Sequence, residues 1–160
     1  MEFLGPSSAK ELSEMAKSIW MEHYTTFLDP RSIEIIVEDW QSESAIIGQM
    51  SEGHLYSFIV HEGRNIGYRC VLPQGDDLFV SKIYVDKEHR GQGFGSRALT
   101  EMLDYGRGIG SKRAYLHVNK HNEIAIRAYK AKGFVIEESR VIPLDNGICL
   151  NDYVMVYHYG

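Results

Sequence analysis

The chain has 160 residues, of which 44% are hydrophobic and 24% charged, and its formal net charge is −5. This composition is typical of one globular domain, so we expect a single domain over residues 1–160. It excludes a membrane-spanning protein, because no apolar run approaches the roughly 20 residues that cross a bilayer. With only Cys70 and Cys149 it also excludes a disulfide scaffold, and without a signal-peptide pattern the protein is expected to be cytoplasmic.

The first part of the chain is predicted to be helical after a short opening strand at Glu2–Leu4. Ser7 or Ser8 is expected to cap a helix that runs to about Phe27, because its apolar residues recur at helical spacing. A second helix begins at Pro30, since proline is tolerated in a first helical turn.

After a third short helix around Ser44–Ser51, the apolar period changes from helical to alternating. Residues 54–72 are predicted to form two strands around a turn at 62–65, which is a hairpin signal. The β-branched and aromatic residues 78–85 predict a further strand.

The second half alternates between helices and strands. A helix of about four turns is expected to end near Gly108 or Gly110, followed by a strand at 113–118 and a helix at 122–133. Two closing strands, 134–142 and 148–159, are expected around the turn Asp145-Asn146-Gly147. This order predicts an α/β (α+β) domain with helices packed on a mixed sheet.

Residues 88–99, EHRGQGFGSRAL, place three glycines within five positions directly before a predicted helix. Two known anion-binding patterns fit them poorly. The phosphate loop of nucleoside triphosphatases ends in Gly-Lys-Ser/Thr, which is missing here. The dinucleotide fingerprint G-x-G-x-x-A does match from Gly93, but five polar residues separate the strand from the glycines. It also needs an acid for the ribose, and none lies between Asp104 and Glu123.

A third pattern, Arg-x-x-Gly-x-Gly, is satisfied by Arg90, Gly93 and Gly95. Glycines lack a Cβ atom, so backbone N–H groups can approach an anion closely. Those N–H groups begin a helix, where they are unpaired and the helix dipole is positive. The pattern therefore predicts a cradle for a diphosphate, with an ordinary flexible turn as the alternative.

A second motif follows at a fixed distance. Asn122, Ala125 and Tyr129 lie at i, i+3 and i+7 and share one helical face, which ends at Gly133-Phe134. Together the two motifs resemble the Gcn5-related N-acetyltransferase (GNAT) superfamily, which has an Arg/Gln-x-x-Gly-x-Gly/Ala loop and a later Asn-x-x-Ala-x-x-x-Tyr-x-x-x-Gly-Phe helix. The resemblance is strongest over residues 78–134 and extends weakly to the whole chain.

The resemblance implies the GNAT fold, in which helices flank a mixed, mostly antiparallel sheet, and acetyl-CoA as the acetyl donor. The pyrophosphate would lie on backbone amides of the glycine turn, and the pantetheine arm would pair with the strand Ile83-Tyr84-Val85. Asn122 would bond to the pantetheine, cap its helix, or do both. Lys87, Arg90 and Arg97 are candidates for the phosphates, and no metal is implied. The implied cofactor-binding residues are Ile83, Tyr84, Val85, Arg90, Gly91, Gln92, Gly93, Phe94, Gly95, Ser96 and Asn122.

The chemistry needs a neutral amine to attack the thioester and a proton for the departing thiolate. Tyr129 matches the position of the family's general acid, and a phenol can protonate a thiolate if it is well placed. His117 stands where some relatives carry a glutamate, so the base is either this imidazole or a chain of waters. Neither Cys70 nor Cys149 lies in a nucleophile motif, so direct attack is expected rather than an acyl-enzyme.

Charge is distributed unevenly along the chain. Residues 82–132 carry 11 Lys/Arg against 5 Asp/Glu, whereas the remaining residues carry 6 against 17. A basic segment suits a polyanion such as CoA, and an acidic remainder suits a cationic acceptor, although solvated surface charges give the same count.

In this superfamily the first two helices and the final hairpin usually shape the acceptor site. Aromatic side chains with carboxylates favour a cationic amine. Residues 19–24, IWMEHY, and 146–155, NGICLNDYVM, resemble diamine or polyamine acetyltransferases of the superfamily, which points the same way. A protein or peptide acceptor, an aminoglycoside acceptor and a CoA-binding module without catalysis are the alternatives. No nucleic-acid or membrane partner is expected, and a homodimer is one expectation, since relatives are often dimers. The candidate acceptor residues are Trp20, His23, Tyr24, Trp40, Glu34, Glu38, Asp39, Asp145 and Asp152.

Overall fold

A computed structural model describes residues 1–26, 28–143, 147 and 149–160. Short 3-10 turns at Pro6–Ser8, Tyr24–Thr26 and Lys87–His89 connect the longer elements. The helices are α1 (Ala9–His23), α2 (Pro30–Gln41), α3 (Glu43–Ser51), α4 (Phe94–Gly108) and α5 (Glu123–Lys132). The strands are β1 (Leu55–His61), β2 (Arg64–Gln74), β3 (Asp77–Val85), β4 (Arg113–Asn119), β5 (Val135–Pro143) and β6 (Cys149–His158).

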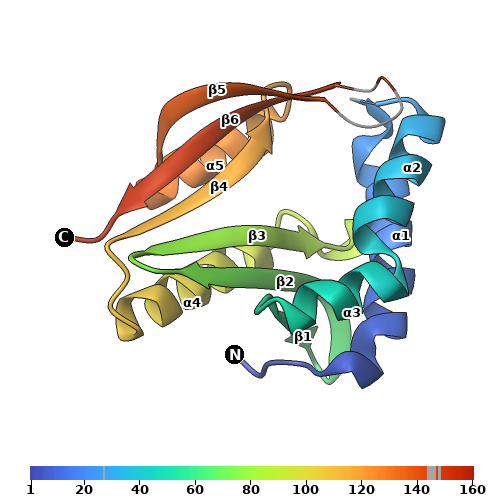
Figure 1. Cartoon of the computed structure of the whole chain (residues 1–160), viewed down its shortest axis with the longest axis horizontal. Helices are drawn as coiled ribbons and strands as arrows, with labels where there is room; N and C mark the ends of the chain where they lie inside the picture. The colour runs from blue at the N-terminus through green and yellow to red at the C-terminus, as the bar shows by residue number, and fades with distance from the viewer. Residues whose placement is uncertain (27, 144–146, 148) are drawn as a thin grey trace.

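The strands form a six-stranded sheet in the order β1-β2-β3-β4-β6-β5 (Figure 1). Every neighbouring pair is antiparallel except β3 and β4, which run parallel. A parallel neighbour requires a crossover, and here α4 supplies it between the two strands. The predicted mixed, mostly antiparallel sheet with flanking helices is confirmed.

β3 and β4 pair over a short stretch only. Asp77, Leu78 and Phe79 face residues 113–115, and beyond these three pairs the strands separate (Figure 1). The register between β2 and β3 shifts at the same point, because Val80 pairs with Val71 and Lys82 with Cys70, which leaves Ser81 as an extra residue. A bulge of this kind bends a strand and increases its twist. The bend turns β3 away from β4 and leaves its β4-facing edge open.

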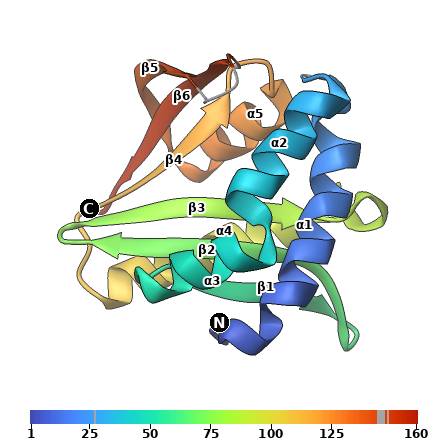
Figure 2. The ribbon, with the colours of Figure 1, turned by 45° about the vertical axis from the view of Figure 1, so that its right-hand side comes forward.

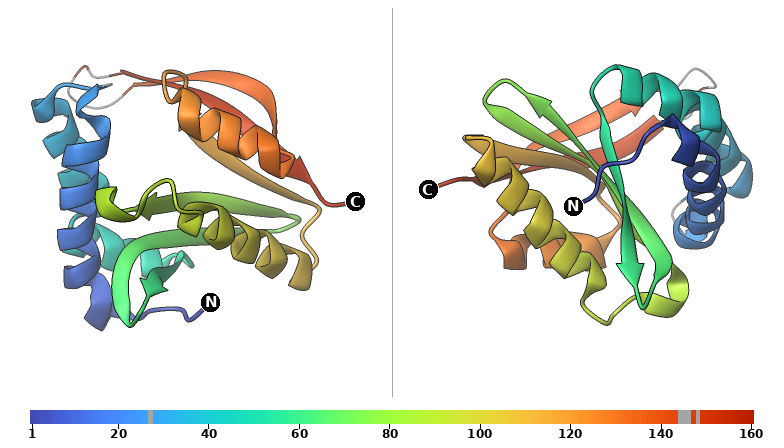
Figure 3. Two further views of the ribbon diagram at one scale, coloured as in Figure 1. Left: turned by 180° about the vertical axis from the view of Figure 1, so that it is seen from behind. Right: turned by 90° about the horizontal axis from the view of Figure 1, so that it is seen from below.

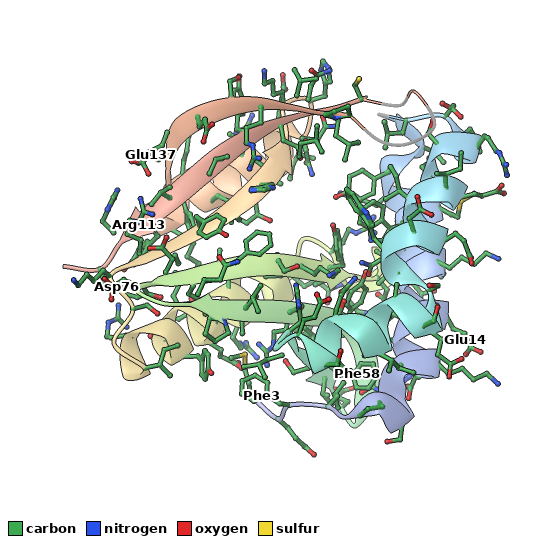
Figure 4. The ribbon with its side chains drawn as sticks, in the orientation of Figure 1. Phe3, Glu14, Phe58, Asp76, Arg113 and Glu137 are labelled. Atoms are coloured by element: carbon green, nitrogen blue, oxygen red, sulfur yellow. The ribbon has the colours of Figure 1, made fainter. Side chains whose placement is uncertain are left out.

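Two ion pairs lie at the end where β3 and β4 are still paired. Arg113 donates to both carboxylate oxygens of Asp77, at 3.0 and 2.7 Å, and Lys112 lies 3.2 Å from Asp76. Figure 4 shows Arg113 and Asp76 at the place where the two strands meet. A bidentate arginine–carboxylate pair also fixes orientation, so it sets the starting point of the divergence.

The helices cover both faces of the sheet. α1, α2 and α3 lie on one side, and α4 and α5 on the other (Figures 2 and 3). The first side buries Trp20, Ile33, Tyr56 and Tyr68 in one cluster, whereas α4 packs Met102 and its neighbours against the opposite face. Both faces of the sheet are therefore packed against helices.

Some local predictions differ from the structure. Residues 2–4 do not form a strand, although the Leu4 N–H donates to the Tyr56 carbonyl at 2.8 Å. The first helix ends at His23 and continues as a 3-10 turn, and the predicted end at Phe27 lies outside the described residues. The same holds for positions 145 and 146 of the predicted closing turn. Within the described part of the chain, no helix is long and apolar enough to cross a membrane.

Gly67 of β2 is required by the close approach of β3. A Cβ atom at this position would lie 2.2 Å from the Tyr84 carbonyl oxygen and 3.0 Å from the Val85 Cα, and both are backbone atoms that cannot move independently. We expect Gly67→Ala to lower the free energy of unfolding by about 2 to 3 kcal/mol, the range of a severe overpacking mutation. Urea denaturation measures the loss.

Gly48→Ala in α3 is the matched control, because nothing lies within 4 Å of its added Cβ. An alanine in an exposed helical position is expected to raise stability by about 0.5 to 1 kcal/mol. Equal effects of the two substitutions would show that the β2–β3 spacing does not depend on Gly67.

Candidate active site

The glycine turn lies between the end of β3 and the start of α4. Gly91 and Gly93 have φ values of 74° and 89°, in the left-handed region that strains other residues, and Gly93 is the N-cap of α4. Beyond the two neighbouring residues, no described atom lies within 4 Å of a Cβ built at either position, so the backbone faces open space. The N–H groups of residues 94–96 start the helix and have no intrahelical partner. The turn can therefore hold an anion on its backbone.

Arg90 braces the turn. Its Nε donates to the Val85 carbonyl at 3.0 Å, and its Nη2 lies 2.6 Å from the Glu22 carboxylate on α1. The hydrogen bond to Arg90 holds the pKa of Glu22 below its usual value. Gln92 turns back in the same way, since its amide donates to the Glu88 carbonyl at 2.9 Å. Arg90 and Gln92, two of the predicted cofactor-binding residues, thus form contacts within the protein.

A cavity of about 310 Å³ opens on the face covered by the first three helices. Its walls come from α1, α2 and α3 on one side and from β3, β4 and the β5–β6 pair on the other, so it spans the parting strands. Much of the lining is aromatic or aliphatic: Trp20, Tyr24, Leu28, Trp40, Phe79 and Ile142. A cavity of this size and lining suits a small organic molecule.

Tyrosine hydroxyls gather beside the open edge of β3. The hydroxyls of Tyr24 and Tyr84 lie 3.2 Å apart in a hydrogen bond, and Trp20 Nε1 donates to the Tyr68 hydroxyl at 3.1 Å. Burial raises the pKa of Tyr24 to about 12. These hydroxyls stay protonated at neutral pH and can donate hydrogen bonds.

Tyr129 of α5 lies near this group rather than in the cavity lining. It packs against Phe134, with ring centroids 5.9 Å apart. Burial raises the pKa of Tyr129 and the proximity of Tyr24 raises it further, which indicates that the two hydroxyl groups share one region. A phenol held neutral in this way keeps its proton at neutral pH and can act as a proton donor.

Asn122 is buried and joins α5 to α1. Its side-chain oxygen accepts from the Ala125 N–H at 3.2 Å, so it caps the helix as the sequence predicts. Its Nδ2 lies 3.4 Å from His23 Nε2. Burial lowers the pKa of His23 and keeps that ring neutral, which suits a nitrogen that accepts. The predicted contact of Asn122 with pantetheine stays a prediction.

Ile83, Tyr84 and Val85 form the end of β3, where that strand has left β4. Their side chains alternate between the two faces. Tyr84 packs with the cluster under α1, whereas Ile83 and Val85 pack beneath α4. The backbone edge of these three residues thus lies between the cavity and the glycine turn, as the pantetheine assignment requires.

His117 lines the cavity from β4. Burial lowers its pKa first, and the positive charge of Arg140 lowers it further, so the ring is neutral at neutral pH. Its Nε2 lies 3.4 Å from the Arg140 Nη1, an arrangement in which the arginine donates and the imidazole accepts. The choice between this ring and a water chain as the base stays open.

The acidic residues expected at the acceptor site separate into two groups. Asp152 lines the cavity and is buried, and burial raises the pKa of its carboxyl group. Glu34, Glu38 and Asp39 are exposed on α2 and do not line it. Asp145 lies outside the described residues. Asp152 is therefore the single carboxylate among the described lining residues. The three acids of α2 lie on the solvent-exposed face of that helix.

Sequence reasoning missed the α3 side of the cavity. Gln49, His54, Ser81 and Lys82 line it there. Lys82 is two residues before Tyr84 on the same strand, so the two-residue period of a strand was the available signal. Within the described chain, no group of three or more His, Cys, Asp or Glu side chains is placed to hold a metal.

Comparison with known proteins identifies the family of this chain. The profile of the Acetyltransferase (GNAT) family matches residues 12–134. The chain belongs to this family. Uncharacterized N-acetyltransferases of Mycobacterium bovis and Mycobacterium tuberculosis are 37% identical over 98 residues, which cover 60% of this chain. The match spans 62% of the length of those relatives.

Solved structures share the fold at low identity. The PaiA N-acetyltransferase of Thermoplasma acidophilum, solved in complex with coenzyme A, superposes with a TM-score of 0.82 at 18% identity, covering 99% of this chain and 97% of that one. The ribosomal-protein-S18-alanine N-acetyltransferase of Escherichia coli gives 0.71 at 19% identity, covering 98% and 91%. These likenesses show that the GNAT fold extends over nearly the whole chain.

Asp152 gives a test based on pH. Its raised pKa means that the folded state binds the proton more tightly than the unfolded chain, so its contribution to stability is present at low pH and is lost as the pH rises through the raised pKa. We expect Asp152→Asn to raise Tm at pH 7 by about 2 °C for a domain of this size. The difference should vanish below a pH of about 4, where both states are protonated.

Thermal unfolding monitored by circular dichroism between about pH 3 and pH 8 measures the effect. Asp39→Asn is the control, because it removes the same charge from an exposed position of α2. A stability loss in Asp152→Asn at pH 7 would show that the carboxylate has a stabilising partner in the fold.

Proposed function

We propose that this protein transfers the acetyl group of acetyl-CoA to the primary amine of a small molecule bound in the cavity. The observation that carries the proposal is the open edge of β3, which lies between the glycine turn and the cavity. An extended pantetheine arm has amide groups that can pair with a strand edge, while its pyrophosphate lies on the amides of residues 91–96. This path delivers the thioester to the tyrosine group beside the cavity.

In the proposed reaction the amine attacks the thioester carbonyl directly. The nitrogen forms the new bond to the carbonyl carbon, the carbon–sulfur bond breaks, and the thiolate leaves with the electron pair. Tyr129 gives its proton to the sulfur, and its raised pKa keeps that proton in place until the thiolate forms. His117 or water removes the proton from the amine.

We propose further that the acceptor carries a cationic amine. Asp152 supplies a carboxylate to the cavity wall, and the rings of Trp20, Tyr24 and Trp40 supply faces that attract a cation. Diamines and polyamines are the narrower class that the sequence predicts. A cytoplasmic location and a homodimer also stay predictions.

Tyr129→Phe tests the chemistry, since it removes the hydroxyl and keeps the ring that packs on Phe134. We expect kcat to fall by about 100-fold or more, the usual contribution of a general acid, while the Kd for acetyl-CoA changes little. Thiol release from acetyl-CoA is measured with diamines, polyamines, amino acids and peptides. Tyr105→Phe on α4 is the matched control and should keep full activity.

The panel separates the alternatives. Turnover with peptides alone would overturn the small-molecule acceptor and keep the mechanism. If no amine gives turnover while acetyl-CoA still raises Tm, the protein would be a CoA-binding module without catalysis. Full activity in Tyr129→Phe would remove this residue from the acid role.

The ion pair between Arg90 and Glu22 gives a second test, which concerns CoA binding. If Arg90 positions the turn by holding α1, then Arg90→Met and Glu22→Gln both loosen the turn and weaken CoA binding. We expect each Kd to rise about twofold to fivefold, the equivalent of 0.5 to 1 kcal/mol for a partly exposed ion pair. Isothermal titration calorimetry with CoA measures it.

The two substitutions also separate bracing from direct phosphate binding. If Arg90 serves the phosphates and Glu22 competes for it, Glu22→Gln would tighten CoA binding while Arg90→Met weakens it. Opposite signs would therefore contradict the bracing role.

A further inference from the structure

Lys82 brings a positive charge to the α3 side of the acceptor cavity. It lies on β3, one residue after the extra residue of the bulge, and lines the cavity together with Gln49 and His54. Its ammonium group donates to Gln49 Oε1 at 2.9 Å and to the Ser81 hydroxyl at 3.3 Å. It also lies over the Tyr56 ring, 5.1 Å from the centroid. The described contacts use two of its three N–H groups.

The groups around Lys82 are held in place. Gln49 Nε2 donates to the Trp40 carbonyl at 2.8 Å, which fixes the amide so that its oxygen faces Lys82. The Tyr56 hydroxyl donates to the same oxygen. The Nδ1 of His54 donates to the Gln49 backbone carbonyl at 3.1 Å, which directs this ring as well. A preorganised set of this kind loses little entropy when a ligand binds.

The charge of Lys82 has no anionic partner in the part of the chain that the structure describes. Among the described residues, no Asp or Glu oxygen lies within 4 Å of the Lys82 ammonium, and its oxygen partners are neutral. Cys70, its neighbour on β2, is a buried thiol whose pKa is raised to about 12, so it carries no charge at neutral pH. Removing an ammonium from water costs several kcal/mol unless an anion accompanies it. The burial of Lys82 accordingly lowers its pKa.

We propose that Lys82, held in place by Gln49, binds a carboxylate of the acceptor, so that the acceptor carries an amine and a carboxylate on one small molecule. This inference rests on the proposed function and narrows it. A diamine or polyamine fits the Asp152 wall but offers no negative group to Lys82. An amino acid, or a related amino carboxylate, offers both.

The dimensions of the cavity agree with such a molecule. Asp152 lies on β6 and Lys82 on β3, two strands apart in the sheet, which places their backbones about 10 Å or more apart. Aromatic and aliphatic side chains line the cavity together with the two charges, and a volume of about 310 Å³ leaves room for an apolar body of amino-acid size. Opposite charges at two separate positions of the cavity lining also favour one orientation of the acceptor.

The test compares amines that differ in the carboxylate. The pairs are phenylalanine with phenylalaninamide, lysine with cadaverine, and 4-aminobutyrate with 4-aminobutanamide. For at least one pair, we expect wild-type kcat/KM to be tenfold or more higher for the carboxylate member, and Lys82→Met to bring that ratio close to one. Lys82→Arg keeps the charge and should keep most of the preference. Lys17→Met, which removes an exposed lysine of α1, should leave the ratio unchanged.

A binding measurement keeps this test separate from catalysis. Isothermal titration calorimetry in the presence of CoA compares N-acetylphenylalanine with N-acetylphenylalaninamide, and we expect tighter binding of the acid in wild type but not in Lys82→Met. Turnover without any carboxylate preference would overturn the role of Lys82 and keep the proposed function. Selective binding of the acid without turnover would overturn the proposed function and keep the carboxylate site. A preference that persists in Lys82→Met would assign the selectivity to another group.

Discussion

The separation of β3 from β4 is the constraint on which the rest of the structure depends. A strand edge presents N–H and C=O groups that need hydrogen-bond partners, and β3 loses its neighbour after three residue pairs. The bulge at Ser81 turns the strand away, and the ion pair between Arg113 and Asp77 holds the point of divergence. The open edge of β3 and the cavity beside it both follow from this one departure from regular pairing.

Burial sets the protonation state of the candidate catalytic groups. The same loss of water raises the pKa of Tyr129 and lowers that of His117, so each group is held in its neutral form. A neutral phenol can donate a proton and a neutral imidazole can accept one. The site therefore needs no charged catalytic pair, and its fixed charges, Asp152 and Lys82, lie on the cavity walls instead.

Those two charges oppose the stability of the fold. Burial raises the pKa of Asp152 and lowers that of Lys82. The ionised form of each side chain therefore has a higher free energy in the fold than in water. Apolar side chains at both positions would fill the cavity at lower cost. Two unfavourable charges facing one apolar cavity are the pattern expected where a ligand supplies the missing partners.

The sequence by itself determined the local features of this protein. The glycines before α4, the Asn122 cap of α5 and the alternation along β3 depend on contacts between near neighbours, which residue type and spacing already specify. Only the tertiary structure decided that Arg90 holds Glu22, that Asp152 alone of the described candidate acids enters the cavity, and that Gln49 fixes Lys82. These contacts join residues 33 or more positions apart, and they follow from how α1 to α3 and the last two strands close around the sheet, which no local pattern encodes.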